Sequence, residues 1–123
     1  MINVGVDLVE TSRIKKSIQN PRFLNKVFSS LEIQKLKEKN FNVQSISARF
    51  FAKEAFSKAV GLGFRKFTFR DVQILQDELG KPYIMLEGKA KDLFNNSNYE
   101  FSVSLTHTKS YASAVVICND KSK

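Results

Sequence analysis

The sequence predicts one α+β domain, with helices concentrated in the N-terminal half and packed on an antiparallel sheet. Apolar residues between positions 11 and 60 recur at helical spacing, whereas after position 71 they alternate with polar residues as in strands. The chain has 123 residues, 42% of them hydrophobic and eleven of them phenylalanine, which is enough for one core. Since no repeat, low-complexity tract or linker interrupts it, we expect a single domain over residues 1–123.

The N-terminal third predicts a strand followed by short helices. Apolar residues alternate over Ile2–Leu8, which is typical of a half-buried strand, so Asp7 should point off the apolar face near the strand's end. A short helix is expected over Thr11–Gln19. Asn20-Pro21 is typical of an N-cap and first helical position, and so predicts a new helix carrying Phe23–Phe28.

Two longer helices follow, and each has a terminal signal. Ser29-Ser30-Leu31-Glu32 is a capping box, which predicts a helix from there to about Asn40. The longest helix is expected over Ser45–Val60. Gly61 and Gly63 should end it, because glycine readily adopts the left-handed conformation of a helix C-terminus.

The second half predicts the antiparallel sheet. Gly80-Lys81-Pro82 is typical of a turn that joins two strands into a hairpin, and Lys89–Phe94 predicts one short helix. The expected strands are Val72–Gln76, Tyr83–Leu86, Phe101–Thr106 and Tyr111–Cys118.

The charge is distributed unevenly along the chain. Lysine and arginine number 20 against 12 acidic residues, a net charge of +8. Residues 1–70 hold 14 basic and 5 acidic residues, while residues 71–123 hold 6 and 7. This asymmetry indicates a basic face directed at phosphates, a nucleic acid or an acidic protein, and a solvated surface that keeps the protein soluble explains it equally well.

Several classes of protein are disfavoured. No apolar run approaches the roughly 20 residues that a membrane helix needs. The N-terminus alternates and carries Asp7 and Glu10, unlike a secretory signal peptide. Cys118 is the single cysteine, so an intramolecular disulfide or a cysteine-based zinc site is excluded, and its place at the end of an apolar run favours burial. We therefore expect a cytoplasmic protein, without a membrane partner.

The first candidate for chemistry is the carboxylate pair Asp7 and Glu10. A carboxylate at the end of a strand is a suitable ligand for Mg²⁺, which takes oxygen atoms from one or two carboxylates, waters and phosphates. Each residue taken alone also fits a plain structural role at the start of the following helix.

The second candidate lies on the longest predicted helix. Arg49 and Lys53, and likewise Glu54 and Lys58, are spaced i,i+4 and so project to similar sides of the helix. Three cations around the Glu54 carboxylate would suit a phosphate-rich ligand with a metal ion. The plainer interpretation is an ordinary surface ion pair between Glu54 and Lys58.

The third and fourth candidates are short segments of the second half. Gly80-Lys81-Pro82 could be only a hairpin turn. Ser104, His107 and Thr108 lie at and just past the end of a predicted strand, and His107 is the only histidine, the side chain that titrates nearest neutral pH. A lone histidine at a strand end is also commonly structural.

Taken in order, these segments resemble the holo-acyl-carrier-protein synthase family of 4′-phosphopantetheinyl transferases. The resemblance covers nearly the whole chain, with one departure at Phe51, where many relatives carry a small residue. Its four motifs are Gly5-Val-Asp7-Leu-Val-Glu10, Arg49-Phe-Phe-Ala-Lys53-Glu54-Ala-Phe-Ser-Lys58-Ala59, Gly80-Lys81-Pro82 and Ser104-Leu-Thr106-His107-Thr108.

The resemblance implies a fold, a reaction and a site. The reaction is transfer of 4′-phosphopantetheine from coenzyme A to a serine of an acyl carrier protein, in support of fatty acid and lipid synthesis. Asp7 and Glu54 would ligate Mg²⁺, and Lys58 would stabilise charge at the attacked phosphate or help to deprotonate the serine. The implied coenzyme A contacts are Arg49, Lys53, Gly80, Lys81, Pro82, Ser104, His107 and Thr108.

The resemblance also implies two kinds of partner. Helices at 11–28 would dock the acidic carrier protein, which explains the basic N-terminal half, and short members of the family are homotrimers with sites between protomers. The implied docking residues are Arg13, Lys16, Arg22, Phe23 and Lys26.

A small basic nucleic-acid-binding module and a catalytically silent coenzyme A-binding protein are the alternatives to this function. The nucleic-acid-binding module is disfavoured because the aromatic residues fall on apolar faces and no recognition motif is present.

Overall fold

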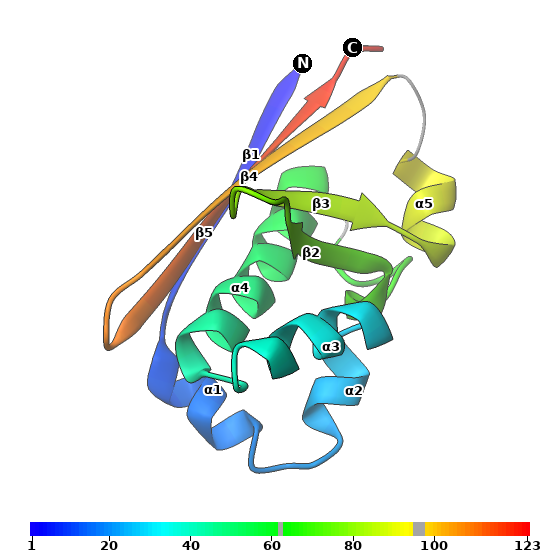
Figure 1. Ribbon diagram of the computed structural model, residues 1–123. Helices are drawn as coiled ribbons and strands as arrows, with labels where there is room; N and C mark the ends of the chain where they lie inside the picture. The colour runs from blue at the N-terminus through cyan, green and yellow to red at the C-terminus, as the bar shows by residue number, and fades with distance from the viewer. Residues whose placement is uncertain (62, 95–97) are drawn as a thin grey trace.

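The computed structural model describes residues 1–61, 63–94 and 98–123. One long helix runs through its centre, with a three-stranded antiparallel sheet of order β1-β5-β4 on one side and a β2–β3 hairpin on the other (Figure 1). The elements are β1 (Ile2–Glu10), α1 (Thr11–Ser17), α2 (Phe23–Val27), α3 (Ser30–Glu38), α4 (Val43–Val60), the 3₁₀ turn η1 (Phe69–Asp71), β2 (Val72–Gln76), β3 (Pro82–Leu86), α5 (Gly88–Phe94), β4 (Tyr99–His107) and β5 (Tyr111–Asp120).

This arrangement confirms the α+β class, and one local prediction is wrong. Asn20-Pro21 does not begin a helix, since α2 starts only at Phe23. The Asn20 side chain instead accepts a hydrogen bond from the Arg22 amide at 3.0 Å, so the pair forms a turn between α1 and α2. The sheet also includes the N-terminal strand, because β1 pairs with β5 along its whole length.

Helix α4 has clear signals at both ends. The Asn42 side chain caps its start by accepting a hydrogen bond from the Ser45 amide at 2.7 Å. Its C-cap is Gly61, which has the left-handed φ of 77° that the sequence predicts there. Buried phenylalanines, among them Phe51 and Phe56, fix the helix in the core.

Helix α4 packs on β1 through small residues. A Cβ on Gly5 would lie 1.9 Å from the Ala55 carbonyl oxygen and 2.7 Å from the Ala59 amide nitrogen, so no larger residue fits there. The side of β1 that carries Gly5, Asp7 and Val9 therefore faces α4, since these residues alternate along the strand.

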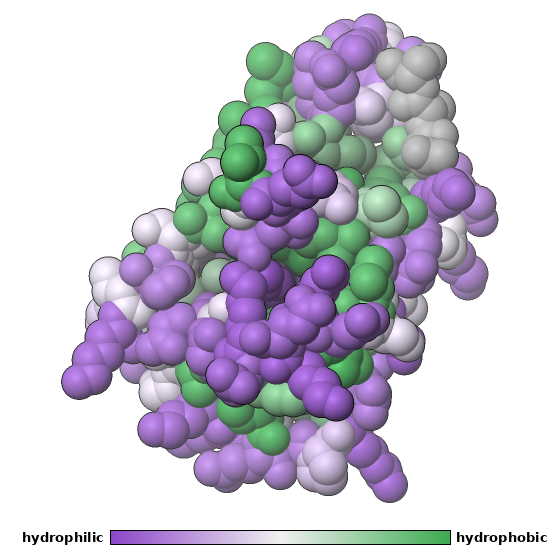
Figure 2. Space-filling model, viewed as in Figure 1, coloured by the Kyte–Doolittle hydropathy of each residue, from purple (hydrophilic) through white to green (hydrophobic). Residues whose placement is uncertain are grey.

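The apolar side of β1 consequently faces away from the helices. Ile2, Val4, Val6 and Leu8 are 53–69% exposed, which reverses the usual expectation that the apolar side of a strand is buried. Figure 2 shows hydrophobic side chains at the surface along the edge that the sheet forms. We call this surface the outer sheet face, and it comprises Ile2, Val4, Val6 and Leu8 of β1 with Tyr111, Val115 and Ile117 of β5.

Two exclusions made from the sequence can be compared with the structure. Cys118 is free and buried in β5, as its apolar neighbours predict. Within residues 1–61, 63–94 and 98–123, none of the helices combines the length and the hydropathy needed to cross a membrane.

Candidate active site

Two carboxylates from distant parts of the chain meet between β1 and α4. Asp7 approaches from the strand and Glu54 from the helix, and the two carboxyl groups lie close enough for Asp7 to shift the pKa of Glu54. Their side chains are only 11% and 22% exposed. Oδ2 of Asp7 is buried with no hydrogen-bond donor, so a second charged oxygen beside it requires either a proton or a cation.

The contact changes the protonation of Glu54. Burial, the hydrogen bond to Asp7 and the charge of Asp7 raise the pKa of Glu54 to about 7, against the opposing effect of Arg13 and Lys58. Two oxygen ligands of this kind fit a hard divalent cation, which would bind in place of the proton on Glu54. In the part of the chain that the structure describes, no cluster of three or more His, Cys, Asp or Glu side chains could hold a metal.

The raised pKa predicts an unusual pH dependence of stability in the metal-free protein. Because the folded pKa of about 7 exceeds the unfolded value of 4.5, the proton on Glu54 stabilises the fold below pH 4.5 and this stabilisation is lost as the pH rises through 7. Compared with Glu54→Gln, the wild type should lose about 2–3 kcal/mol of its free energy of unfolding as the pH rises over this range. Urea unfolding from pH 4 to 8 measures the difference, and the difference in stability between the wild type and Glu38→Gln, at an exposed pair with Lys35, should show no such change with pH.

Two cations border the carboxylate pair. Nζ of Lys58 lies 3.3 Å from Oδ1 of Asp7 and 3.1 Å from the Val6 carbonyl oxygen. A guanidinium nitrogen of Arg13 lies 3.6 Å from Oε1 of Glu54, and the group stacks over the Phe50 ring at 5.9 Å. Arg13, predicted on the docking helices, therefore also belongs to the acidic site.

The structure corrects the position of Lys53. Its side chain is fully buried, and Nζ donates to Oε1 of Glu32 at 2.7 Å and to the carbonyl oxygens of Phe69 and Val72 at 2.8 and 2.7 Å. Burial lowers its pKa to about 8 although Glu32 opposes the shift. With all three donors in use inside the core, Lys53 cannot contact coenzyme A phosphates, and the prediction of three cations around Glu54 is wrong. Consecutive helical residues differ by 100° in direction, which is why Lys53 and Glu54 point to different surroundings.

Arg49 is also turned away from Glu54. It is 4% exposed and donates to the Ser45 carbonyl at 3.2 Å and to the Gln76 side chain at 3.1 Å. Gln76 in turn donates to the Gly80 carbonyl at 3.1 Å. Arg49 and the hairpin turn, both predicted to contact coenzyme A, are thus joined through Gln76 in one part of the structure.

The turn itself is organised by an aspartate. Oδ1 of Asp77 accepts from the amides of Leu79 and Lys81, each at 2.9 Å, and Gly80 has a left-handed φ of 85°. Lys81 is exposed and Pro82 begins β3. The geometry of the turn therefore explains the residue types of Gly80-Lys81-Pro82. The exposed Lys81 side chain remains accessible to a phosphate.

The segment around the histidine lies at the open end of β4. Ser104 pairs with Val115 and so points to the outer sheet face, away from the side of the sheet that carries Asp7. His107 is exposed at the last position of β4. Thr108 closes the following turn by accepting from the amides of Ser110 and Tyr111 at 3.3 and 3.1 Å.

The predicted docking residues lie on two neighbouring helices. Lys16 is exposed on α1, while Arg22 and Lys26 are exposed at α2. Phe23 is half-buried with its ring 5.7 Å from that of Phe50. Figure 2 shows a mainly hydrophilic surface over this end of the molecule.

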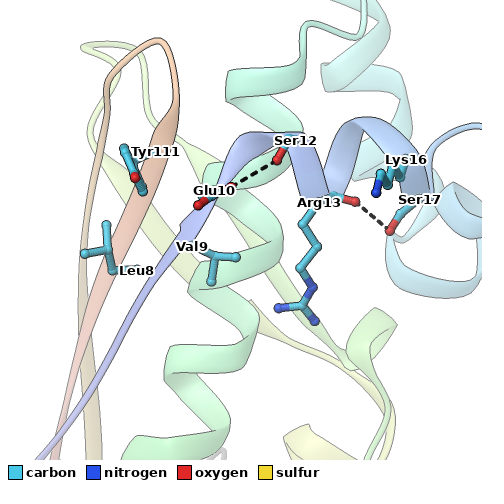
Figure 3. A pocket seen from close by; sticks show the side chains of 8 residues that line it. All are labelled: Leu8, Val9, Glu10, Ser12, Arg13, Lys16, Ser17 and Tyr111. Carbon is cyan, nitrogen blue, oxygen red and sulfur yellow. Dashed lines mark hydrogen bonds between the residues drawn. The ribbon is translucent and has the colours of Figure 1, made fainter.

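A wide groove lies beside the acidic site. It has a volume of about 730 Å³ and runs between the end of β1 and helix α1 (Figure 3). Arg13 connects the two, since it lines the groove and also pairs with Glu54. The remaining lining residues are Leu8, Val9, Glu10, Ser12, Lys16, Ser17 and Tyr111.

Sequence reasoning missed two features of this region. Tyr111 lines the groove, but its position in a strand pattern carries no signal of that role. Glu32 is recognisable only as a capping-box residue, whereas its bond to Lys53 joins positions 21 residues apart.

Comparison with known proteins identifies the class. Residues 3–116 match the family described as the 4′-phosphopantetheinyl transferase superfamily. A holo-[acyl-carrier-protein] synthase of Clostridium botulinum (strain Eklund 17B / Type B) is 46% identical over 115 residues, which are 93% of this chain and 94% of that protein. The synthase of Fusobacterium nucleatum is 36% identical over 119 residues, 95% of this chain and 98% of that one.

Solved structures agree with these relatives. The crystal structure of the Helicobacter pylori holo-[acyl-carrier-protein] synthase in complex with coenzyme A has a TM-score of 0.81 and 32% identity, covering 94% of this chain and 99% of that one. The Neisseria meningitidis synthase has a TM-score of 0.87 and 28% identity, covering 97% and 99%. The chain belongs to the holo-[acyl-carrier-protein] synthase family of 4′-phosphopantetheinyl transferases.

Proposed function

We propose that this chain transfers 4′-phosphopantetheine from coenzyme A to a serine of an apo-acyl carrier protein, giving the holo carrier protein and adenosine 3′,5′-bisphosphate. The observation that carries the proposal is the meeting of Asp7 and Glu54 beside Lys58 in a chain of this family. The holo carrier protein would serve fatty acid synthesis, and both substrates are cytoplasmic compounds, so we place the enzyme in the cytoplasm.

The proposed cofactor is Mg²⁺, held by Asp7 and Glu54. The buried oxygen of Asp7 that has no hydrogen-bond partner, and the nearby Glu54 carboxyl group whose pKa is raised by Asp7, support this ligand pair. Bound there, Mg²⁺ would neutralise pyrophosphate charge and orient the reacting phosphorus. Two carboxylates leave most of the coordination to waters and phosphate oxygens, as is usual for this ion.

The residues of the site then have distinct tasks. The serine Oγ attacks the β-phosphorus, the bond from that phosphorus to the oxygen bridging the α-phosphate breaks, and the serine proton passes to a base, either a side chain or an ordered water. Lys58, whose Nζ is held near Asp7 with a half-exposed side chain, is placed to donate to a phosphate oxygen and offset the developing charge. Arg13 bonds Glu54 from the other side and limits its movement.

The decisive experiment is mass spectrometry of an apo-carrier protein after incubation with this chain, coenzyme A and Mg²⁺. We expect a gain of one phosphopantetheine, which disappears without the metal. A rise in the thermal stability of this chain with coenzyme A, without a gain in mass of the carrier protein, would instead indicate a silent coenzyme A-binding protein. Stabilisation by an oligonucleotide alone would indicate a nucleic-acid-binding module.

We further propose that the active form is a homotrimer with a coenzyme A site between neighbouring protomers. The outer sheet face supports this, because four apolar side chains of β1 are more than half exposed in one chain. Ser104 borders that face. A partner protomer packed on it would bring its own Ser104, His107 and Thr108 toward a neighbour's acidic site.

The docking proposal for α1 and α2 predicts the effect of a charge reversal. Arg22→Glu should slow association with the acidic carrier protein, raising its KM about tenfold or more, most strongly at low salt, because electrostatic attraction mainly accelerates encounter. The affinity for coenzyme A should not change. Lys91→Glu, an equal charge change on α5, is the matched control, and a loss of coenzyme A affinity in Arg22→Glu would contradict the docking assignment.

A further inference from the structure

A buried ion pair between Glu32 and Lys53 lies on a different face of α4 from the carboxylate site, about 100° around the helix. Besides the bonds of Lys53, Glu32 accepts at Oε1 from the Ser29 amide at 3.0 Å and at Oε2 from the Ile74 amide at 3.0 Å. Both side chains are fully buried, and Nζ of Lys53 also lies 5.1 Å from the centre of the Phe28 ring. The pair therefore ties α4 to the start of α3, to η1 and to β2 at once.

Such a pair is a poor way to gain stability. Removing two charges from water costs about as much as their attraction returns, and apolar side chains of similar volume often stabilise a core as well or better. The pair does fix the position of both side chains, because Lys53 donates three hydrogen bonds and Glu32 accepts two more from backbone amides, all 2.7–3.0 Å long.

The side of α4 that faces β1 is held less firmly. There the helix backbone lies on Gly5 of β1 next to Ala55 and Ala59, and the side chain that joins the two elements is the half-exposed Lys58, whose Nζ donates to the Val6 carbonyl at 3.1 Å. Rotation of the helix by about 20° would move a carboxyl group ~6 Å from its axis by about 2 Å. That displacement would separate Glu54 from Asp7 and carry Lys58 with it.

We propose that Glu32 and Lys53 are positioning residues that fix the rotation and height of α4 on β1, and so hold Glu54 against Asp7 and Lys58 beside the phosphate. Lys53 directly precedes Glu54 in the helix, so holding Lys53 in one position also limits the movement of Glu54. The catalytic part of this inference rests on the proposed function, whereas the packing of α4 on β1 can be measured without substrate or metal.

The test uses two variants of the full chain. The double variant Glu32→Gln/Lys53→Met removes both charges and keeps similar volumes, so no unpaired charge is left in the core. Glu32→Asp keeps both charges but shortens the reach by one methylene, and it decides the question should the double variant fail to fold. Phe94→Leu, in the aromatic cluster with Phe56 and Phe67, is the control for a general loss of stability.

Three measurements separate positioning from plain stability. Nuclear Overhauser effects between the Gly5 Hα and the amides of Ala55 and Ala59 report the packing of α4 without any ligand. Mn²⁺ binding by calorimetry reports the two carboxylates, and transfer assays give kcat and KM. We expect altered Overhauser effects, a loss of about 10- to 100-fold in Mn²⁺ affinity, and a lower kcat at unchanged KM for the carrier protein.

The outcomes discriminate between the claims. Folded variants with wild-type Overhauser effects and Mn²⁺ affinity, or equal losses in Phe94→Leu, would overturn the positioning proposal. If the wild type itself neither binds Mn²⁺ nor modifies the carrier protein, the proposed function fails, and the Overhauser effects alone decide whether the pair sets the position of α4.

Discussion

Replacing Glu54 by glutamine should reduce phosphopantetheine transfer by more than about a thousandfold while the chain stays folded, because one of two proposed metal ligands loses its charge. The amide keeps the volume of the carboxyl group in its partly buried place between Asp7 and Arg13. Without metal at pH 8, this variant should be more stable than the wild type, since it removes the repulsion that raises the pKa of Glu54. Mass spectrometry of the carrier protein measures the transfer, and urea unfolding measures the stability.

A matched control is available on α3. Glu38→Gln makes the same chemical change at a carboxylate that is 59% exposed and whose Oε2 lies 3.9 Å from Nζ of Lys35. Phosphopantetheine transfer should therefore be unchanged. Turnover of Glu54→Gln at the wild-type rate would refute the assignment of Glu54 to the metal. Loss of activity together with loss of the folded state would indicate a structural residue instead.

Placing a charge on the outer sheet face should dissociate the proposed trimer. In a single chain Val6 is 53% exposed and pairs with Val115 across the two strands, so Val6→Glu should fold normally. In an assembly the carboxylate would be buried without a partner, at a cost of at least about 3 kcal/mol per interface. We therefore expect dissociation to single chains and, because a neighbour is proposed to complete the coenzyme A site, loss of transfer at concentrations where the wild type is fully active.

Analytical ultracentrifugation of both proteins measures the change. Leu93→Glu, on α5 and 38% exposed, adds the same charge away from the outer sheet face and should leave the assembly intact. A Val6→Glu protein that sediments like a trimeric wild type would place the interface elsewhere. A wild type that sediments as a single chain would refute the trimer.

Local signals in the sequence were sufficient for most elements. The period-two and helical patterns predicted every strand of the sheet and hairpin and the long helix, and the capping box at Ser29 and the stop at Gly61 lie where expected. The shared face of Glu54 and Lys58 follows from their i,i+4 spacing alone. By contrast, the approach of Asp7 to Glu54 was implied only by the family resemblance, because nothing in the spacing of two residues 47 apart requires contact.

The sequence by itself thus determined that Glu54 and Lys58 share one face of a helix. It also determined the alternation of apolar and polar residues along β1. Which side of β1 meets the helix was decided only by the tertiary structure, because a period of two defines two faces without saying which one is covered. Gly5 settles it, since only a residue without a Cβ allows α4 to lie that close. The inward turn of Lys53 toward Glu32 was decided in the same way, because a buried charge takes whichever partner the packing brings to it, at any distance along the chain.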